Sequence, residues 1–157
     1  MTIDPVTATP HPADLASRYA AAPAAWPTPP RFDPRRRWYA RLHMDADHEA
    51  FLLTWLPGQA TDLHDHGGAT GAFLVVTGRV TEDVVGRDRP RRLVARDYRA
   101  GQVRSFGPRH IHRVRNAGAD PAVTLHVYTP GLASMNQYEL AGGELRLLRT
   151  DREGADW

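Results

Sequence analysis

The sequence predicts an all-β domain, a sandwich or barrel of short strands, with a short helical arm in front of it. From about Arg36 onward, short β-like runs follow one another and are broken by Gly, Pro and Asp. No long helical period follows Arg36. The first thirty residues hold seven of the thirteen prolines, which is typical of a segment that runs over a domain surface.

The sequence predicts three parts that follow one another along the chain. Residues 1–35 are the arm, and within it "HPADLASRYAAA" predicts one short helix, because Pro12 stands near its start and alanines follow. Residues 36–148 are the domain, with predicted strands in "RWYARLHM", "EAFLLTWL", "GAFLVVTG", "RVTEDVV", "RRLVARDY", "QVRSF", "HRVRN", "AVTLHVYT" and "MNQYEL". The polar "RTDREGADW" at 149–157 predicts a loose tail.

Composition narrows the function classes. The chain has no cysteine, so disulfides and zinc–thiolate sites are excluded, and His, Asp and Glu remain as metal ligands. All 20 basic residues are arginine, but the net charge is only +2, and the arginine clusters at 35–37 and 87–92 indicate solvated loops rather than a nucleic-acid surface. Without a membrane-length apolar run or the order of a signal peptide, we expect a cytoplasmic protein with no nucleic-acid or membrane partner. The oligomeric state stays open, and a monomer is compatible with the sequence.

The stretch "TDLHDHGGATGAF" offers the clearest chemical signal. His64 and His66 stand one residue apart, and alternate residues of a strand face the same side, so both imidazoles can point at one spot. By the same parity Asp65 points away from that spot. Single histidines are usually surface or satisfied core residues, and we assign His11, His43 and His48 to that class.

The spacing around these histidines resembles the two motifs of the cupin superfamily. Gly58 precedes His64 by six residues and Gly78 follows His66 by twelve, while Gly101, His112 and Asn116 match the second motif. Gly107 and Arg109 replace the Pro and Gly of that motif. The resemblance implies a jelly-roll β-barrel with His64, His66 and His112 as metal ligands, and His110 as a neighbour of the third.

Gly71 stands where many cupins have a metal-binding glutamate. Its lack of a side chain predicts a site of three neutral imidazoles, with space where the carboxylate would be and up to three open positions on an octahedral metal. Ferrous iron suits imidazole ligands and open positions. An anionic substrate ligand can supply the missing charge, and a thiolate is a natural candidate because metal coordination lowers the pKa of a thiol.

The run "AVTLHVYTP" places Thr124, His126 and Tyr128 on one face of a strand. Such a face either meets water or lines a buried polar pocket. Together with "WLPGQATDLHDHG" and "HRVRN", it resembles the cysteine dioxygenase family, bacterial type, from about Trp38 to Tyr138. The resemblance implies iron(II) held by the three histidines and an outer triad of Thr124, His126 and Tyr128. It implies that no cysteine–tyrosine cross-link forms, because the chain has glycine at position 71.

"RWYARL" resembles the family segment that lies beside the bound substrate. This implies that Arg41 recognises the substrate carboxylate, with Tyr39 nearby. A solvent-facing strand residue is the alternative for Arg41.

Three functional hypotheses follow. The first is an iron(II)-dependent thiol dioxygenase of cysteine catabolism, which adds both atoms of O2 to L-cysteine and forms cysteine sulfinic acid. The second keeps this chemistry but takes 3-mercaptopropionate, because family members that oxidise that thiol tend to have glutamine at the Arg41 position. The third is a non-catalytic metal-binding cupin, against which the polar triad argues.

Overall fold

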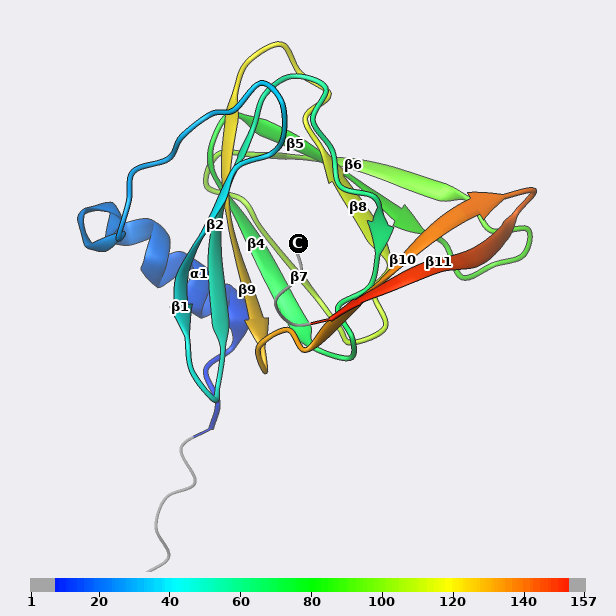
Figure 1. Cartoon of the computed structure of the whole chain (residues 1–157), viewed down its shortest axis with the longest axis horizontal. Coiled ribbons are helices and arrows are strands. Elements are labelled where there is room, and N and C mark those ends of the chain that lie inside the picture. Colours follow the sequence, from blue (N-terminus) through cyan, green and yellow to red (C-terminus); the bar gives the residue numbers. More distant parts are fainter. Residues whose placement is uncertain (1–7, 153–157) are drawn as a thin grey trace, which may run out of the picture.

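The computed structural model describes residues 8–152, which form two facing β-sheets with a helix on the outside (Figure 1). The first sheet has the order β1-β2-β9-β4-β7, with β1 (Tyr39–Met44), β2 (Glu49–Trp55), β4 (Thr70–Thr77), β7 (Val103–Phe106) and β9 (Ala122–Thr129). The second has the order β11-β10-β3-β8-β5-β6, with β3 (Leu63–His64), β5 (Arg79–Val85), β6 (Leu93–Arg99), β8 (His112–Arg115), β10 (Ser134–Ala141) and β11 (Glu144–Arg152). The predicted all-β fold class is confirmed.

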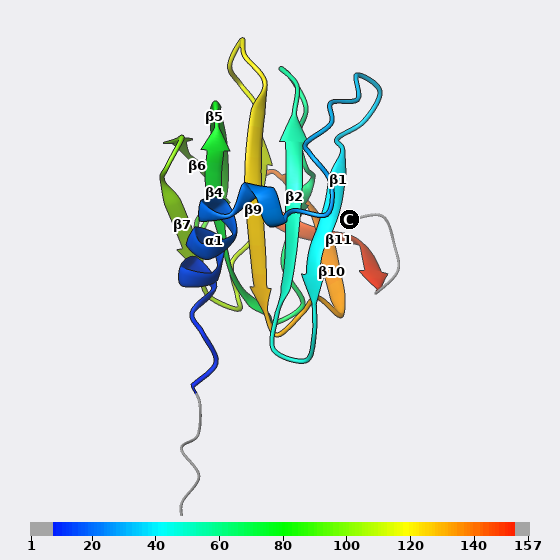
Figure 2. The same ribbon diagram turned by 90° about the vertical axis from the view of Figure 1, so that its left-hand side faces the viewer.

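The predicted helix is α1 (Pro12–Ala21), and it covers the outer face of the five-stranded sheet (Figure 2). The local sequence explains where it starts. The His11 side chain accepts a hydrogen bond from the Ala13 N–H, and Pro12, which has no N–H to donate, occupies a first-turn position where no helical hydrogen bond is made. Leu15 then packs against Leu74 and Val127 of the sheet. A 3-10 turn, η1 (Pro23–Ala25), follows. No helix among the described residues is long and apolar enough to span a membrane.

Strand β9 lies in the middle of the five-stranded sheet and is buried on both faces. Its apolar face packs outward beneath the arm, where Val123, Leu125 and Val127 belong to the clusters around Tyr19 and Leu42. Because successive side chains of a strand alternate, the polar face must point into the barrel. Packing of the arm against the apolar face of β9 therefore leaves the polar residues of this strand facing the barrel interior.

The sharp turn from β4 to β5 depends on Gly78. This residue has a φ of 77°, and a Cβ atom built there would lie 2.5 Å from the Pro121 carbonyl oxygen. Only glycine combines the left-handed backbone with so close an approach. The turn sends the chain from the five-stranded sheet into the six-stranded one, so it helps to close the barrel.

Two strands differ from the expectation. The two-residue β3 was not predicted as a separate strand, because its length is too short to give a period. The polar segment that starts at residue 149 was predicted as a tail, but β11 continues to Arg152. Pairing with β10 explains the difference, since Gln137 donates to Asp151 and Thr150 donates to Asn136 across the two strands. Residues 153–157 of the predicted tail and 1–7 of the arm lie outside the described residues.

Candidate active site

The structure brings His64, His66 and His112 together inside the barrel. Strand β3 pairs with β8 so that His64 lies directly opposite His112, and His66 follows two residues after His64. The three ring centroids are 4.8 to 5.0 Å apart, and one nitrogen from each ring lies within 4.8 Å of the others. His64 on β3, His66 just after the end of β3 and His112 on β8 therefore converge on one point, and the two-residue spacing puts His64 and His66 on the same side, as predicted.

Hydrogen bonds fix the tautomer of two of these rings. His64 Nδ1 lies 2.8 Å from the Asp62 carbonyl oxygen and His112 Nδ1 lies 2.7 Å from Glu82 Oε1. Because both partners can only accept, each ring carries its proton on Nδ1 and leaves the Nε2 lone pair available. This is the arrangement in which histidine ligates a metal through Nε2.

His66 supplies the strongest sign that a ligand belongs here. The residue is 1% exposed, and within residues 8–152 neither of its nitrogens has a hydrogen-bond partner. It lies between the rings of Phe106 and Tyr128, with centroids 4.7 and 5.1 Å away. A buried polar atom without a partner costs roughly 1–3 kcal/mol, and a metal ion bound to one nitrogen would remove that cost. The three histidines thus fit a metal by their donor chemistry.

All three imidazoles are neutral near pH 7. Burial lowers the pKa of His64 to about 3, with the neighbouring His112 as a further cause. Burial also lowers the pKa of His66 and His112. Neutral imidazoles keep the lone pairs that a metal needs, so the site has the right protonation state for ligation without any change of pH.

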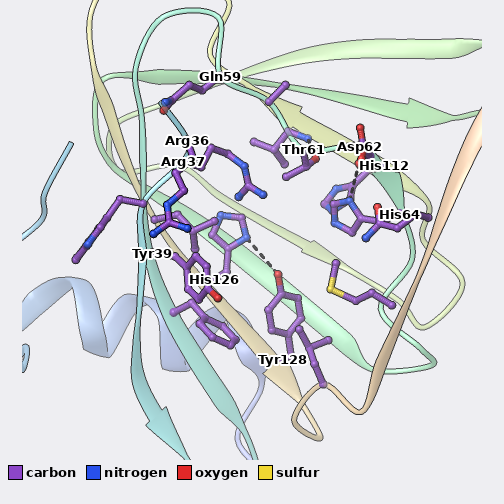
Figure 3. Close-up of a pocket in the computed structure, with 18 of the residues that line it drawn as sticks. Arg36, Arg37, Tyr39, Gln59, Thr61, Asp62, His64, His112, His126 and Tyr128 are labelled. Atoms are coloured by element: carbon purple, nitrogen blue, oxygen red, sulfur yellow. Dashed lines mark hydrogen bonds between the residues drawn. The ribbon is translucent and has the colours of Figure 1, made fainter. Parts of the chain in front are cut away.

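A second set of polar groups, on β9 and the neighbouring β2, forms a hydrogen-bonded relay whose last contact, between His126 and Tyr128, is drawn in Figure 3. Trp55 Nε1 donates to Thr124 Oγ1 at 2.8 Å, Thr124 Oγ1 lies 2.9 Å from His126 Nε2, and His126 Nδ1 lies 3.4 Å from the Tyr128 hydroxyl. The indole can only donate, so the Thr124 proton is available for His126 Nε2. In that direction His126 carries its proton on Nδ1, donates to the Tyr128 oxygen and leaves the phenol proton for a group in the cavity.

The Tyr128 hydroxyl is held in its protonated form. Burial raises the pKa of Tyr128 far above its usual value, and burial lowers the pKa of His126 well below its usual value. The relay is therefore neutral near pH 7. Its end in the cavity is a hydrogen-bond donor.

The cavity between these groups has a volume of about 810 Å³. His64 and His112 lie on one side of it, and Arg37 and Tyr39 lie on the opposite side (Figure 3). Its other lining side chains include the apolar Phe51, Leu53, Leu132 and Met135 and the relay residues His126 and Tyr128. A small polar molecule placed here would contact the histidines, the relay and a cationic wall.

The structure places the two predicted substrate-binding residues differently. Tyr39 lines the cavity, whereas Arg41 does not. Arg41 Nε lies 3.1 Å from Glu49 Oε1, and its guanidinium carbon lies 5.8 Å from the centroid of the Phe51 ring. Glu49 is 1% exposed, so this buried carboxylate holds Arg41 by a direct ion pair.

Arg37 lines the cavity in its place. Its guanidinium carbon lies 5.2 Å from the centroid of the Trp55 ring. Burial lowers the pKa of Arg37, while Tyr128, Asp62 and Tyr39 act in the opposite direction. Sequence reasoning assigned residues 35–37 to a solvated loop. The feature of the sequence that could have pointed to Arg37 is its place directly before Trp38 and Tyr39, where the chain enters β1.

The space predicted at Gly71 does not exist, and this expectation was wrong. A Cβ atom built on Gly71 would lie 2.6 Å from one carbon of the Phe106 ring and 3.0 Å from Tyr128 Cδ1. Strand β4 pairs with β7 so that Gly71 is directly opposite Phe106. The aromatic rings, rather than an open position, therefore occupy the place of a side chain at residue 71.

The other candidate ligands have structural partners. Asp65 accepts hydrogen bonds from Asn136 and Tyr138, as expected for a residue that points away from the histidines. His43 and His48 stack with centroids 4.3 Å apart beside Asp45, in the β1–β2 hairpin. This second cluster is only partly exposed, because His48 is buried and its Nε2 lies 2.8 Å from the Tyr19 hydroxyl.

Sequence reasoning missed Glu82, which accepts hydrogen bonds from His110 and His112. Burial alone would raise the pKa of Glu82, but these hydrogen bonds outweigh it and hold the pKa well below the usual value. The signal in the sequence was an acid at an inward-facing position of "RVTEDVV", where a buried carboxylate needs a partner.

Comparison with known proteins agrees with this site. Residues 9–141 match the family described as cysteine dioxygenase type I. The chain belongs to this family. Membership supports a thiol dioxygenase, a class of enzyme that uses a small thiol and O2, and it agrees with a metal held by the three histidines.

Two solved structures show the same fold as this cysteine dioxygenase type I chain. The TT1209 protein from Thermus thermophilus is 25% identical, with a TM-score of 0.56, over 65% of this chain and 90% of that one. An uncharacterized conserved protein with a double-stranded β-helix domain from Klebsiella pneumoniae is 17% identical, with a TM-score of 0.57, over 76% of this chain and 90% of that one. The predicted cupin-type barrel is thereby confirmed.

Proposed function

We propose that this chain is an iron(II)-dependent thiol dioxygenase that converts L-cysteine and O2 to cysteine sulfinic acid. The observation that supports it most directly is His66, whose two nitrogens are buried and have no hydrogen-bond partner among the described residues, although its ring centroid lies only 4.9 and 5.0 Å from those of His64 and His112. The polar relay that ends at Tyr128 lies beside these histidines. A protein that merely holds a metal does not need such a relay.

The proposed reaction adds both oxygen atoms to the sulfur and releases nothing. The sulfur loses four electrons, O2 gains four, and the thiol proton stays on the sulfinic acid or passes to solvent. When bound by His64, His66 and His112, iron(II) supplies the redox chemistry that lets a thiol react with O2. Imidazole ligands suit ferrous iron.

Tyr128 and the cavity wall supply orientation. With its pKa raised by burial, the Tyr128 phenol keeps its proton near pH 7 and can donate a hydrogen bond to the sulfur or oxygen of the reacting groups. The apolar side chains of Phe51, Leu53, Leu132 and Met135 line part of the cavity beside these polar groups. A hydrogen-bond donor that the fold already holds in place stabilises developing negative charge without having to reorganise during the reaction.

The substrate carboxylate is proposed to bind at the wall formed by Arg37 and Tyr39. Arg37 faces the histidines across the cavity, and a guanidinium binds a carboxylate with two parallel hydrogen bonds. Arg41 would take this role only by leaving the buried Glu49 carboxylate without its ion-pair partner. Orientation of the carboxylate then fixes the distance of the thiol from the histidines.

A second candidate is 3-mercaptopropionate dioxygenase with the same chemistry. The preference for L-cysteine depended on Arg41, and the ion pair between Arg41 and Glu49 weakens that basis. The carboxylate of either thiol can reach the Arg37 wall.

Turnover with both thiols tests the proposal. The purified chain is loaded anaerobically with iron(II), its metal content is measured, and O2 uptake and sulfinate formation are followed with L-cysteine and with 3-mercaptopropionate. One O2 consumed per L-cysteine sulfinate formed, and no uptake by His64→Ala, would support the proposal. Higher kcat/KM for 3-mercaptopropionate would move the assignment to the second candidate. No uptake with either thiol by chain that retains iron would favour a non-catalytic metal-binding protein.

A further inference from the structure

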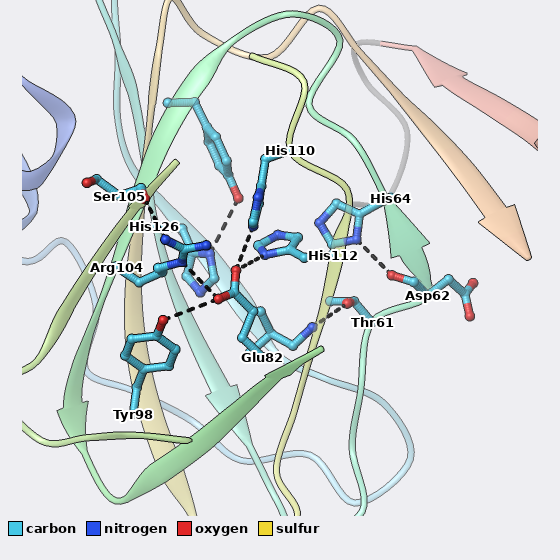
Figure 4. Close-up of polar contacts among 12 residues, drawn as sticks. Thr61, Asp62, His64, Glu82, Tyr98, Arg104, Ser105, His110, His112 and His126 are labelled. Atoms are coloured by element: carbon cyan, nitrogen blue, oxygen red, sulfur yellow. Dashed lines mark hydrogen bonds and ion pairs between the residues drawn. The ribbon is translucent and has the colours of Figure 1, made fainter. Parts of the chain in front are cut away.

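Glu82 lies at the centre of a hydrogen-bond network that includes His112 and His110 (Figure 4). Its side chain is 1% exposed. Oε1 accepts from His112 Nδ1 and from His110 Nε2, each at 2.7 Å. Oε2 accepts from Arg104 Nε at 2.9 Å and from the Tyr98 hydroxyl at 3.4 Å. Four donors from three strands and a loop thus surround one carboxylate.

This network holds His112 in one orientation. The carboxylate can only accept, so the His112 proton stays on Nδ1 and Nε2 points toward His64 and His66. His110 fills the other lone pair of Oε1 and stacks on Phe106 with ring centroids 4.8 Å apart. The carboxylate itself has little freedom to move, because both of its oxygens are held.

We propose that Glu82 is the positioning residue of the metal centre: through its hydrogen bond it sets the tautomer and orientation of His112 and strengthens this ligand. The proposal rests on the metal-binding part of the proposed function. Carboxylate partners of this kind raise the basicity of a metal-bound histidine. Glu82 thus places a carboxylate one hydrogen bond behind His112, on the side of the ring opposite the nitrogen that would bind the metal.

A metal ion between Glu82, His110 and His112 is the competing interpretation, since one ligand atom from each lies within 4.8 Å of the others. The geometry argues against it. Both histidine nitrogens already lie at hydrogen-bond distance from the same oxygen, Oε1. The second oxygen is bonded to the permanent cation Arg104, which would repel a metal ion.

The neighbouring Asp83 provides a matched control. It is also buried and bonded to arginines, with Oδ2 accepting from Arg113 Nε at 2.6 Å and from Arg115 Nε at 2.8 Å. Because side chains alternate along β5, Asp83 faces away from the barrel interior. Asp83→Asn therefore removes the charge of a buried carboxylate next to Glu82 on the same strand, but one that makes no hydrogen bond to His112.

The experiment measures metal affinity without turnover. Cobalt(II) and iron(II) are titrated anaerobically against a competing chelator for wild type, Glu82→Gln and Asp83→Asn, after circular dichroism has shown that each is folded. Glu82→Gln is expected to weaken metal binding about 10- to 100-fold, with a changed cobalt(II) visible spectrum, because an amide cannot accept on both sides. Asp83→Asn is expected to stay within about threefold of wild type. Affinity of Glu82→Gln equal to that of wild type would overturn the proposal.

Two further measurements keep the proposal testable if Glu82→Gln does not fold. Long-range proton–nitrogen correlation spectra of the zinc-loaded wild type are expected to show His112 protonated on Nδ1, and a proton on Nε2 would contradict the proposal. One bound metal ion per chain is expected for wild type and for His110→Ala. If wild type binds a second metal ion and His110→Ala does not, that ion lies at Glu82, and the proposal is contradicted. A wild type that binds metal but oxidises no thiol would refute the proposed function and leave this inference standing.

Discussion

The replacement of Gly71 by alanine tests the packing around the three candidate metal ligands most directly. Gly71 is buried, and a Cβ atom at this position would lie 2.6 and 2.7 Å from two carbons of the Phe106 ring. Real Cβ atoms essentially never come so close to another heavy atom, so the ring must move. Phe106 stacks on His66, and Tyr128, the other neighbour, stacks on the opposite side of the same imidazole.

The expected cost follows from this geometry. Overpacking a tight core by one methyl group costs about 1–3 kcal/mol. For a chain of 157 residues, each kcal/mol lowers the melting temperature by about 2–4 °C. Gly71→Ala should therefore lower the melting temperature of the metal-free protein by about 2–12 °C. Because the displaced rings enclose His66, metal affinity should fall as well.

Scanning calorimetry and metal titration check this prediction, with Gly107→Ala as the control. A Cβ atom built on Gly107 has no heavy atom of the described part of the chain within 4 Å, and the backbone there is not in the left-handed region, so alanine should be close to neutral. The double variant Gly71→Ala/Phe106→Leu should recover part of the lost stability, because leucine leaves room for the methyl group. A Gly71→Ala protein as stable as Gly107→Ala would refute the reasoning, since it would mean that the position has free space.

Three other predictions concern chemistry. Tyr128→Phe should lower the rate of thiol-dependent O2 uptake about 10- to 100-fold with unchanged iron content, and an unchanged rate would contradict the donor role. Arg37→Ala should raise the KM for the thiol about 10- to 100-fold, whereas Arg41→Ala should mainly lower the melting temperature; the reverse pattern would return carboxylate recognition to Arg41. For the metal-free protein, the folded state keeps His64 neutral down to its pKa of about 3, while the unfolded state binds a proton below 6.5. The free energy of unfolding should thus fall as pH is lowered from 6.5 toward 3, and a denaturation midpoint that is constant over this range would contradict the assigned burial of the histidines.

The sequence by itself determined the parts of this protein that depend on local periodicity and spacing. Strand alternation put His64 and His66 on one side and Asp65 on the other, and the resemblance to the second cupin motif pointed to His112. Pro12 and the alanines after it predicted α1, which the structure confirms. These features were predictable because each depends on residues that are close together in the chain.

Only the tertiary structure decided the features that depend on contacts between distant segments. The arm covers the apolar face of β9, and this packing turns Thr124, His126 and Tyr128 into the barrel. The β2 residue Glu49 holds Arg41, which leaves Arg37 at the cavity.

Contacts between distant segments also decide the surroundings of the histidines. Phe106 of β7 fills the place beside Gly71, and Glu82 of β5 reaches His112 of β8. A buried carboxylate or a clash at a glycine becomes visible only when the strands are paired, because the sequence specifies which face a side chain occupies but not which side chain from another strand meets it there.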